Sequence, residues 1–158
     1  MFTLSFYGYA SSDNPGKVIA GWVEKISLKD QSYVLKAKLD SGAETSSIHA
    51  EDIELFKHEG KRWVRFKLLL EDTDGKAMTL ALEKKRARRV KIKQHNGVHD
   101  SRPVVELDIC FDGRPYAVEF TLADRSEFIY PVLLGRRFLA GVAVVDPEAT
   151  FLTQARCQ

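Results

Sequence analysis

Cysteine is scarce in this chain, which holds Cys110 and Cys157 among 158 residues and no Cys-x-x-Cys pair. Nothing in that pattern requires a disulfide, and it favours a reducing compartment. No apolar run approaches the ~20 residues that span a bilayer, so we expect no membrane partner. A His-Glu-x-x-His motif and a Gly-rich phosphate loop with Lys are also missing, so we expect neither a metal nor another cofactor.

Neither sign of charge is in excess, because 24 Lys and Arg stand against 22 Asp and Glu, for a net charge of +2. This balance does not call for a nucleic-acid partner, and any preference for an anionic partner must come from a local cluster of basic residues. With 44% apolar residues, the chain has the composition of one soluble globular domain. We expect that domain over residues 18–158, after an N-terminal arm, residues 1–17, that is a candidate for disorder.

The arm lacks the basic region and the long apolar stretch of a signal peptide. We therefore expect a cytoplasmic protein. An exported location stays open if an upstream signal segment was removed.

Short segments of alternating polarity, separated by turn signals, make up most of the chain. In residues 33–39 and 63–70 apolar side chains alternate with Lys or Arg, which is the pattern of a half-buried strand. Asp112-Gly113 predicts a tight hairpin. Strands are expected over residues 18–26, 33–39, 63–70, 88–93, 104–110 and 116–122, a short helix over 136–140, and a last hairpin from 142–145 and 150–152. Residues 51–58 leave a helical turn and an irregular strand open. These elements predict an all-β barrel or sandwich.

The segment Lys38-Leu39-Asp40-Ser41-Gly42-Ala43-Glu44-Thr45 carries the strongest chemical signal, because it places an acid, a hydroxyl and a glycine at the end of a predicted strand. Peptide hydrolysis by an activated water needs a carboxylate to take the proton of the water and a carboxylic acid to polarise the carbonyl. Two carboxyls ~3 Å apart share one proton in this way. The chain has one such loop, so a two-fold dimer would have to supply the second Asp40.

A second segment, Pro131-Val132-Leu133-Leu134-Gly135-Arg136, completes the pattern. An Asp-Ser-Gly alone is found in ordinary turns, but together the two segments resemble the loop and the hydrophobic-hydrophobic-Gly-Arg brace of a retropepsin-type aspartic protease. Most of residues 18–152 resembles a bacterial and archaeal family of retropepsin-like proteins, often labelled ATP-dependent zinc proteases. Its members are often associated with ATP-grasp ligases that add glutamates to proteins. The matching segments are Gly21–Glu24, Ala37–Ala50, Trp63–Phe66, Asn96–Val98, Ser101–Leu107 and Thr121–Leu139.

This resemblance implies a retropepsin-like closed β-barrel, one lobe per chain, with one short helix after the Leu-Leu-Gly-Arg motif. It also implies a homodimer and gives Asp40 the catalytic role. Ser41, Gly42, Ala43 and Glu44 would support the loop. Ser41 stands where the family usually has Thr and keeps its hydroxyl.

The brace is expected to hold the Asp40 loop from below. Gly135 would let the chain cross under the loop, and Leu133 and Leu134 would anchor it in the core. In the retropepsin pattern the acid of the loop pairs with the Arg of the brace within one subunit. We therefore expect an ion pair between Glu44 and Arg136.

Retropepsins cover the substrate with a β-hairpin flap, and two turns qualify for it. One lies at Asp72–Gly75. The other lies at Gln94–Asp100, with Asn96, Gly97 and Val98 at its tip, and is favoured because the strand after it matches the family. An ordinary surface hairpin is the alternative reading.

The run Lys84-Lys85-Arg86-Ala87-Arg88-Arg89-Val90-Lys91-Ile92-Lys93 is strongly basic. It is interpreted as a nucleic-acid surface, as the solvated face of a strand, or as a docking surface for acidic peptides. Aromatic side chains for base stacking are missing inside the run, which argues against nucleic acid. His95 and His99 flank an Asn-Gly turn signal, which favours loop histidines without a metal.

The predicted function is therefore an aspartic endopeptidase that hydrolyses a peptide bond with a water held between two Asp40 carboxyls of a homodimer. Its substrates would be proteins or peptides, with acidic or glutamate-modified proteins as a candidate class. A catalytically silent peptide-binding module of the same fold is the first alternative, and a zinc-dependent peptidase is the second.

Overall fold

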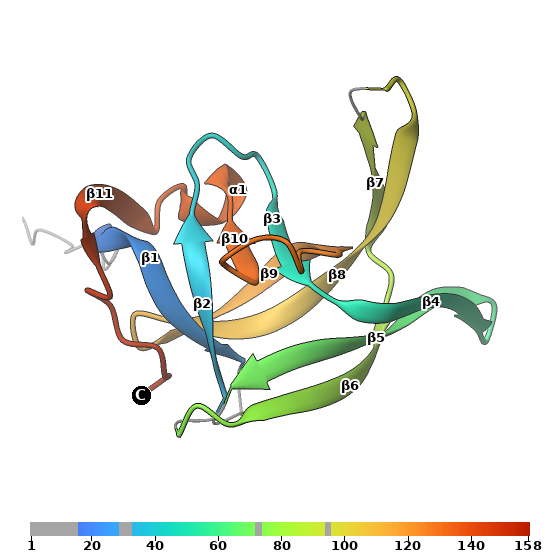
Figure 1. The fold of residues 1–158 in the computed structure, drawn as a ribbon, viewed down its shortest axis with the longest axis horizontal. Helices are drawn as coiled ribbons and strands as arrows, with labels where there is room; N and C mark the ends of the chain where they lie inside the picture. Colours follow the sequence, from blue (N-terminus) through green and yellow to red (C-terminus); the bar gives the residue numbers. More distant parts are fainter. Residues whose placement is uncertain (1–15, 29–32, 72–73, 94–95) are drawn as a thin grey trace, which may run out of the picture.

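The computed structural model describes residues 16–28, 33–71, 74–93 and 96–158 (Figure 1). The expected N-terminal arm therefore lies almost wholly outside the described residues. The strands are β1 Val18–Leu28, β2 Val34–Leu39, β3 Ser46–His49, β4 Glu51–His58, β5 Lys61–Glu71, β6 Ala77–Lys85, β7 Arg88–Lys93, β8 His99–Phe111, β9 Arg114–Ala123, β10 Val132–Leu134 and β11 Ala143–Thr150, and the helix α1 is Arg136–Leu139. Across these ranges no helix is long and apolar enough to cross a membrane.

A closed barrel forms the body of the molecule. Its strands follow the order β1-β8-β9-β3-β10-β2, and β2 pairs back with β1 along Val23↔Lys38 to Ser27↔Val34. β11 extends the barrel by pairing in parallel with β1, and β5 joins β2 at Val34↔Glu71. Two extensions leave the barrel, the β4–β5–β6 sheet and the β7–β8 hairpin (Figure 1).

Alternation places the core as the sequence predicted. The alternating apolar side chains of residues 33–39 and 63–70 point inward and are at most 4% exposed, namely Leu35, Ala37, Leu39, Val64, Phe66, Leu68 and Leu70. The rings of Phe66, Phe111 and Phe120 are fully enclosed. The predicted hairpin at Asp112-Gly113 joins β8 to β9, with both residues at positive φ. The predicted helix and the expected strand over residues 88–93 are confirmed.

One local prediction is wrong, one open alternative is decided in favour of a strand, and one strand was missed. The last hairpin is wrong, because residues 143–150 form the single strand β11 along β1, with a register shift between Gly21 and Val23. A Cβ at Gly21 would lie 2.6 Å from Thr150 Cα, so this close approach requires glycine. Residues 51–58 form a strand, β4, and β6 was not predicted because its side chains are exposed or only half-buried.

Buried hydrogen bonds and a disulfide fasten the C-terminal segment to the barrel. The carboxylate of the fully buried Glu24 accepts hydrogen bonds from Gly21 N (2.6 Å), Leu152 N (2.9 Å), Thr153 N (3.1 Å) and Thr153 Oγ1 (2.9 Å). A disulfide that the sequence pattern did not predict joins Cys110 to Cys157, whose Cα atoms are 5.2 Å apart.

Candidate active site

Asp40 follows directly on the last residue of β2 and opens the loop that leads to β3 (Figure 1). Its backbone N–H donates to the carbonyl of Leu134 at 2.9 Å, and its own carbonyl accepts from Ala43 N at 3.2 Å. These bonds fix the loop on both sides of the carboxylate. The position of the Asp40 side chain is therefore set by backbone geometry.

The Asp40 carboxylate is 27% exposed and has two partners within the chain. Its Oδ1 accepts from Gly42 N at 2.9 Å, and Lys38 Nζ lies 3.3 Å from Oδ2. Burial is the largest single influence on the pKa of Asp40 and acts to raise it. The hydrogen bonds from Gly42, Lys38 and Ala43 and the charge of Lys38 together outweigh burial, so the pKa lies below its ordinary value. In a single chain this group is a carboxylate.

β10 holds the loop from beneath by lying between β2 and β3. It runs parallel to β2 and antiparallel to β3. Just beyond it, Arg136 N donates to the Ala43 carbonyl at 2.8 Å and Arg137 N to the Glu44 carbonyl at 3.1 Å. A Cβ on Gly135 would lie 2.6 Å from Thr45 O and 3.0 Å from Ala43 O. Only glycine fits this crossing, as the sequence predicted.

The expected ion pair between Glu44 and Arg136 is wrong. Arg136 Nη1 instead donates to the carbonyls of Ser41 and Gly42, both at 3.0 Å. Glu44 Oε1 accepts from the next residue, Arg137 Nη2, at 2.9 Å. The arginine of the brace therefore holds the backbone of the loop, and the acid is satisfied by a more exposed neighbour. A charged donor to two carbonyls fixes the loop more firmly than an exposed ion pair would.

Leu133 does not anchor the brace in the core. Val132 and Leu134 are fully buried, whereas Leu133 is half-buried, because neighbours on a strand face opposite sides. Leu133 pairs with Lys38 in parallel register, so its side chain lies on the face that carries Lys38 and Asp40. It belongs to the surface beside the carboxylate.

The favoured flap segment forms a long hairpin. β7 and β8 pair from Arg88↔Val104 to Lys93↔His99. At the tip, Gly97 has a φ of 79° and Val98 N donates to Asn96 Oδ1 at 3.0 Å. Residues 94–95 lie outside the described part of the chain, as do residues 72–73 of the alternative turn. In Figure 1 the hairpin rises on the same side of the barrel as the Asp40 loop.

Arg125 is a residue near this site that the sequence motifs did not single out. Its guanidinium lies 4.5 Å from the Phe128 ring centroid, and its Nε donates to the Tyr130 carbonyl at 3.4 Å. Burial, followed by the charge of Arg102, lowers the pKa of Arg125, and the charge of Asp40 opposes this. Among the described residues no carboxylate forms an ion pair with it. It had no sequence signal, because it lies in a loop.

His49 holds the backbone of that loop. The ring is buried, its Nδ1 accepts from Arg125 N at 2.8 Å, and its Nε2 faces Glu51 Oε1 at 3.4 Å. The neutral ring with its proton on Nε2 satisfies both contacts. His49 is therefore a positioning residue for Arg125.

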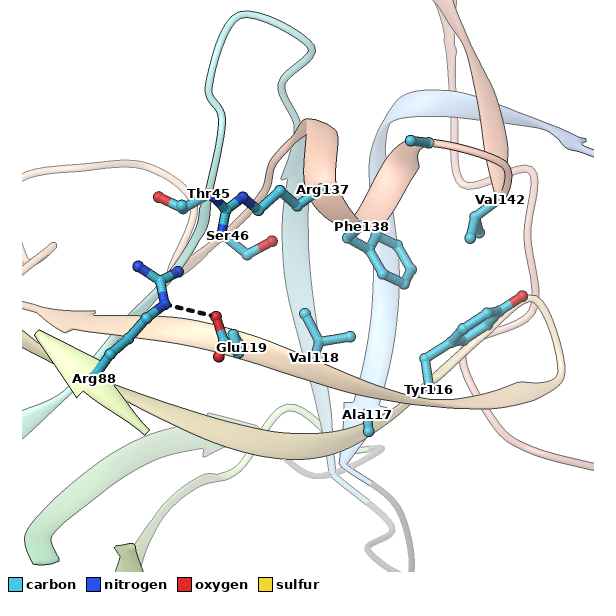
Figure 2. Close-up of a pocket in the computed structure, with 11 residues that line it drawn as sticks. Thr45, Ser46, Arg88, Tyr116, Ala117, Val118, Glu119, Arg137, Phe138 and Val142 are labelled. Atoms are coloured by element: carbon cyan, nitrogen blue, oxygen red, sulfur yellow. Dashed lines mark hydrogen bonds and ion pairs between the residues drawn. The ribbon is translucent and has the colours of Figure 1, made fainter. Parts of the chain in front are cut away.

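A separate pocket of about 330 Å³ lies behind the Asp40 loop. Figure 2 shows its apolar wall, made by Phe138, Tyr116, Val118 and Val142, and the Arg88–Glu119 ion pair at 2.9 Å on its rim. Asp40 is not part of its lining. The pocket is therefore distinct from the surface on which the carboxylate opens.

Within the ranges that the structure describes, no three or more His, Cys, Asp or Glu side chains are grouped as metal ligands. His99 is exposed at the start of β8, and His95 lies outside the described residues. The described residues thus offer no donor set for zinc.

Comparison with known proteins identifies relatives of the chain. It is 41% identical over 117 residues to a probable alpha-L-glutamate ligase of Shewanella pealeana, covering 74% of this chain and 25% of that protein. A probable alpha-L-glutamate ligase of Parasynechococcus marenigrum is 30% identical over 135 residues, covering 85% of this chain and 29% of that protein. The chain thus spans about a quarter of the length of these curated relatives.

A solved structure has the same fold. The Legionella pneumophila protein Lpg0085, described as of unknown function (DUF785), superposes with a TM-score of 0.72 at 35% identity, covering 87% of this chain and 98% of that one. Residues 19–156 match the family described as RimB-like, the retropepsin-like aspartic endopeptidase RimB. This match covers nearly the whole barrel, including the Asp40 loop, its brace and the β7–β8 hairpin. The chain therefore belongs to the RimB-like family of retropepsin-like aspartic endopeptidases.

Proposed function

We propose that this protein is an aspartic endopeptidase whose working unit is a homodimer with two Asp40 carboxyls at its axis. The main support is the Asp40 loop, whose backbone is held by Leu134, Arg136 and Arg137 while the carboxylate stays open to solvent. Membership of an aspartic endopeptidase family supports the same reaction.

One chain supplies half of the chemistry. A lone Asp40, with its lowered pKa, can accept a proton from water but cannot donate one to the peptide carbonyl. A second Asp40 alongside would raise the pKa of one carboxyl of the pair, so that one proton stays shared between them. The carboxylate then takes a proton from the attacking water while the acid protonates the carbonyl oxygen. The resulting tetrahedral diol collapses as the leaving nitrogen takes up a proton.

Acidic or glutamate-modified proteins are the proposed substrate class. Arg125 is half-buried near Asp40, and within the described ranges it has no carboxylate partner. A substrate carboxylate bound there would supply the missing counter-charge. The relatives, described as probable alpha-L-glutamate ligases, also point to glutamate-containing proteins. Arg125→Gln should raise KM for a glutamate-containing peptide more than for its glutamine counterpart.

Cleavage by Asp40→Asn protein is the decisive test. We expect this variant to lose peptide cleavage while keeping its fold and its affinity for peptide. Asp108→Asn is the matched control, because Asp108 is exposed on β8, away from the loop, and it should cleave normally. Cleavage that persists in Asp40→Asn would refute the catalytic role. Sedimentation of the wild-type protein tests the dimer.

The silent peptide-binding module has one observation in its favour. Lys38 Nζ already lies 3.3 Å from Asp40 Oδ2, so part of the carboxylate is neutralised within the chain. If wild-type protein binds peptides but does not cleave them, and Asp40→Asn binds equally well, the binding module is the correct function.

A further inference from the structure

A cluster of cations surrounds an open hollow far from the Asp40 loop. The hollow has a volume of about 310 Å³, and it is lined by Leu55, Phe56, Lys57, Arg62, Trp63, Arg86 and Arg89. We call it the arginine hollow. Arg86 N donates to the Arg62 carbonyl at 3.0 Å, and Ala87 N to the Val104 carbonyl at 2.8 Å. The hollow therefore lies at the base of the β7–β8 hairpin, where β6 passes into β7 (Figure 1).

The cations of the arginine hollow lack counter-charges. Within the described ranges, no carboxylate forms an ion pair with Lys57, Arg62, Arg86 or Arg89, whereas Arg88 of the same basic run is paired with Glu119 at 2.9 Å. Burial is the first cause that lowers the pKa of Arg86, and the charges of Arg89 and Arg62 add to it. Like charges brought together without an anion destabilise one another. A bound anion would relieve this repulsion.

One residue that lines the hollow, Trp63, carries a polar group without a partner. Trp63 Nε1 is enclosed and has no hydrogen-bond partner among the residues described. Buried donors are nearly always satisfied, so an unpaired one indicates a missing acceptor. The cations that line the hollow call for an oxygen anion, and an acceptor there would change the surroundings of Trp63.

We propose that the arginine hollow is an exosite that binds carboxylates of an acidic peptide segment, away from the bond that is cleaved. This rests on the proposed function, because it assigns a second contact to the same class of substrate. Arginine binds carboxylates through paired charge-assisted hydrogen bonds, and such a contact beside the flap hairpin would hold a substrate while another segment enters the cleft.

An acidic peptide fits the hollow better than a nucleic acid does. Next to the hollow, Arg65 lies over the Phe56 ring, 5.0 Å from its centroid, and is neutralised by Glu54 and Glu83 at 3.3 and 2.7 Å. These carboxylates interrupt the basic surface and would repel a continuous phosphate backbone. A peptide segment with only a few separated carboxylates does not need a basic surface longer than the hollow.

The test uses Asp40→Asn protein, so that the peptide is bound but not cleaved. Fluorescence anisotropy would measure the affinity for a fluorescein-labelled decapeptide that carries a few spaced glutamates, with the same peptide carrying glutamines as a neutral probe. Arg86→Ser with Arg89→Ser should weaken glutamate-peptide binding by about tenfold or more, because charge-assisted bonds to two cations are lost. The matched control is Arg114→Ser with Arg156→Ser, two exposed arginines near the β8–β9 turn and the C-terminus, at the other end of the molecule (Figure 1).

That control should change the affinity by less than about twofold, because distant exposed charges are screened. Equal losses in the two double variants, or no loss in the first, would overturn the exosite. Tighter binding of a ten-residue single-stranded oligonucleotide that disappears in the same variant would assign the hollow to nucleic acid and also overturn it.

Two further readouts separate the exosite from folding and from catalysis. Trp63 emission can be followed alone in Trp22→Phe protein, because the chain has two tryptophans. Saturating glutamate peptide should change that emission, and an unchanged spectrum refutes the exosite even if the arginine variants misfold. With Asp40 intact, Arg86→Ser with Arg89→Ser should cleave a neutral peptide normally. If this variant cleaves normally and also binds the glutamate peptide as tightly as before, the exosite is refuted and the proposed function is not.

Discussion

Gly135→Ala tests whether the crossing of the brace under the Asp40 loop sets the geometry of the site. The new methyl group would lie 2.6 Å from Thr45 O and 3.0 Å from Ala43 O, closer than carbon and oxygen tolerate. Both obstacles are backbone atoms, so a side-chain rotation cannot relieve the clash. The loop must therefore move away from the brace.

The magnitude follows from two contributions. Overpacking by one methyl group costs about 1–3 kcal/mol. Displacing the loop would also weaken the Arg136 N to Ala43 O and Arg137 N to Glu44 O hydrogen bonds, now 2.8 and 3.1 Å long, and each contributes about 0.5–1.5 kcal/mol. Together these effects should lower the free energy of unfolding by about 3 kcal/mol, or the melting temperature by roughly 6–12 °C for a domain of this size.

Denaturant unfolding and thermal melting would measure this loss, and peptide cleavage would fall with it. Gly16→Ala is the control, because no atom lies within 4 Å of a Cβ at that position. If Gly135→Ala unfolds at the wild-type denaturant concentration, the crossing is not the constraint described here.

Three further predictions follow from the site and the C-terminal segment. Arg136→Ala should lower the free energy of unfolding by about 1.5–3 kcal/mol, because a charged donor to two carbonyls is lost. Arg137→Ala should lower it by about 0–1 kcal/mol, because only an exposed ion pair is lost. Equal losses in denaturant unfolding would refute the assignment of Arg136 to the loop backbone. Glu24→Gln should lower the free energy of unfolding by about 2–3 kcal/mol, since a buried carboxylate that accepts four hydrogen bonds is replaced by an amide. Faster trimming by a carboxypeptidase would show that the C-terminal segment has been released from the barrel. The proposed dimer would raise the pKa of one Asp40, which is lowered in the lone chain, so between the pKa of the lone chain and the higher pKa of the pair the dimer binds up to one proton more than two separate chains do. Lowering the pH through this window should decrease the dissociation constant by up to about tenfold per pH unit. A dissociation constant that does not change with pH in sedimentation would contradict a shared proton.

Local signals recovered most of the barrel. Alternation placed the inward faces of β2 and β5, and Asp112-Gly113 located a hairpin, because both depend on neighbours in sequence. The parallel pairing of β11 with β1 had no such signal. Pro147-Glu148 resembles a turn, but the partner strand and the missing side chain at Gly21 decide its path. The pairing with β1 therefore outweighs the local turn signal.

The candidate site, too, was predictable only where local residue types decide the structure. The Asp40 loop and Gly135 could be identified from residue types, because their chemistry and close packing need those residues. Which of two adjacent arginines meets Glu44 depends on side-chain directions just after the β10 strand, and a sequence motif does not contain them. Arg125 and the arginine hollow depend on contacts between distant segments, such as Arg62 with Arg86, so their roles appear only in the folded chain.

The order in which the chain is synthesised bears on the brace. Asp40 leaves the ribosome well before the groups that shape its loop, from Leu134 to Arg137. A nascent or truncated chain that stops before them contains the acidic residue without the backbone contacts that orient it. Such a chain would lack the ordered loop that the proposed dimer needs, so under the proposed function a truncated fragment would not cleave other proteins.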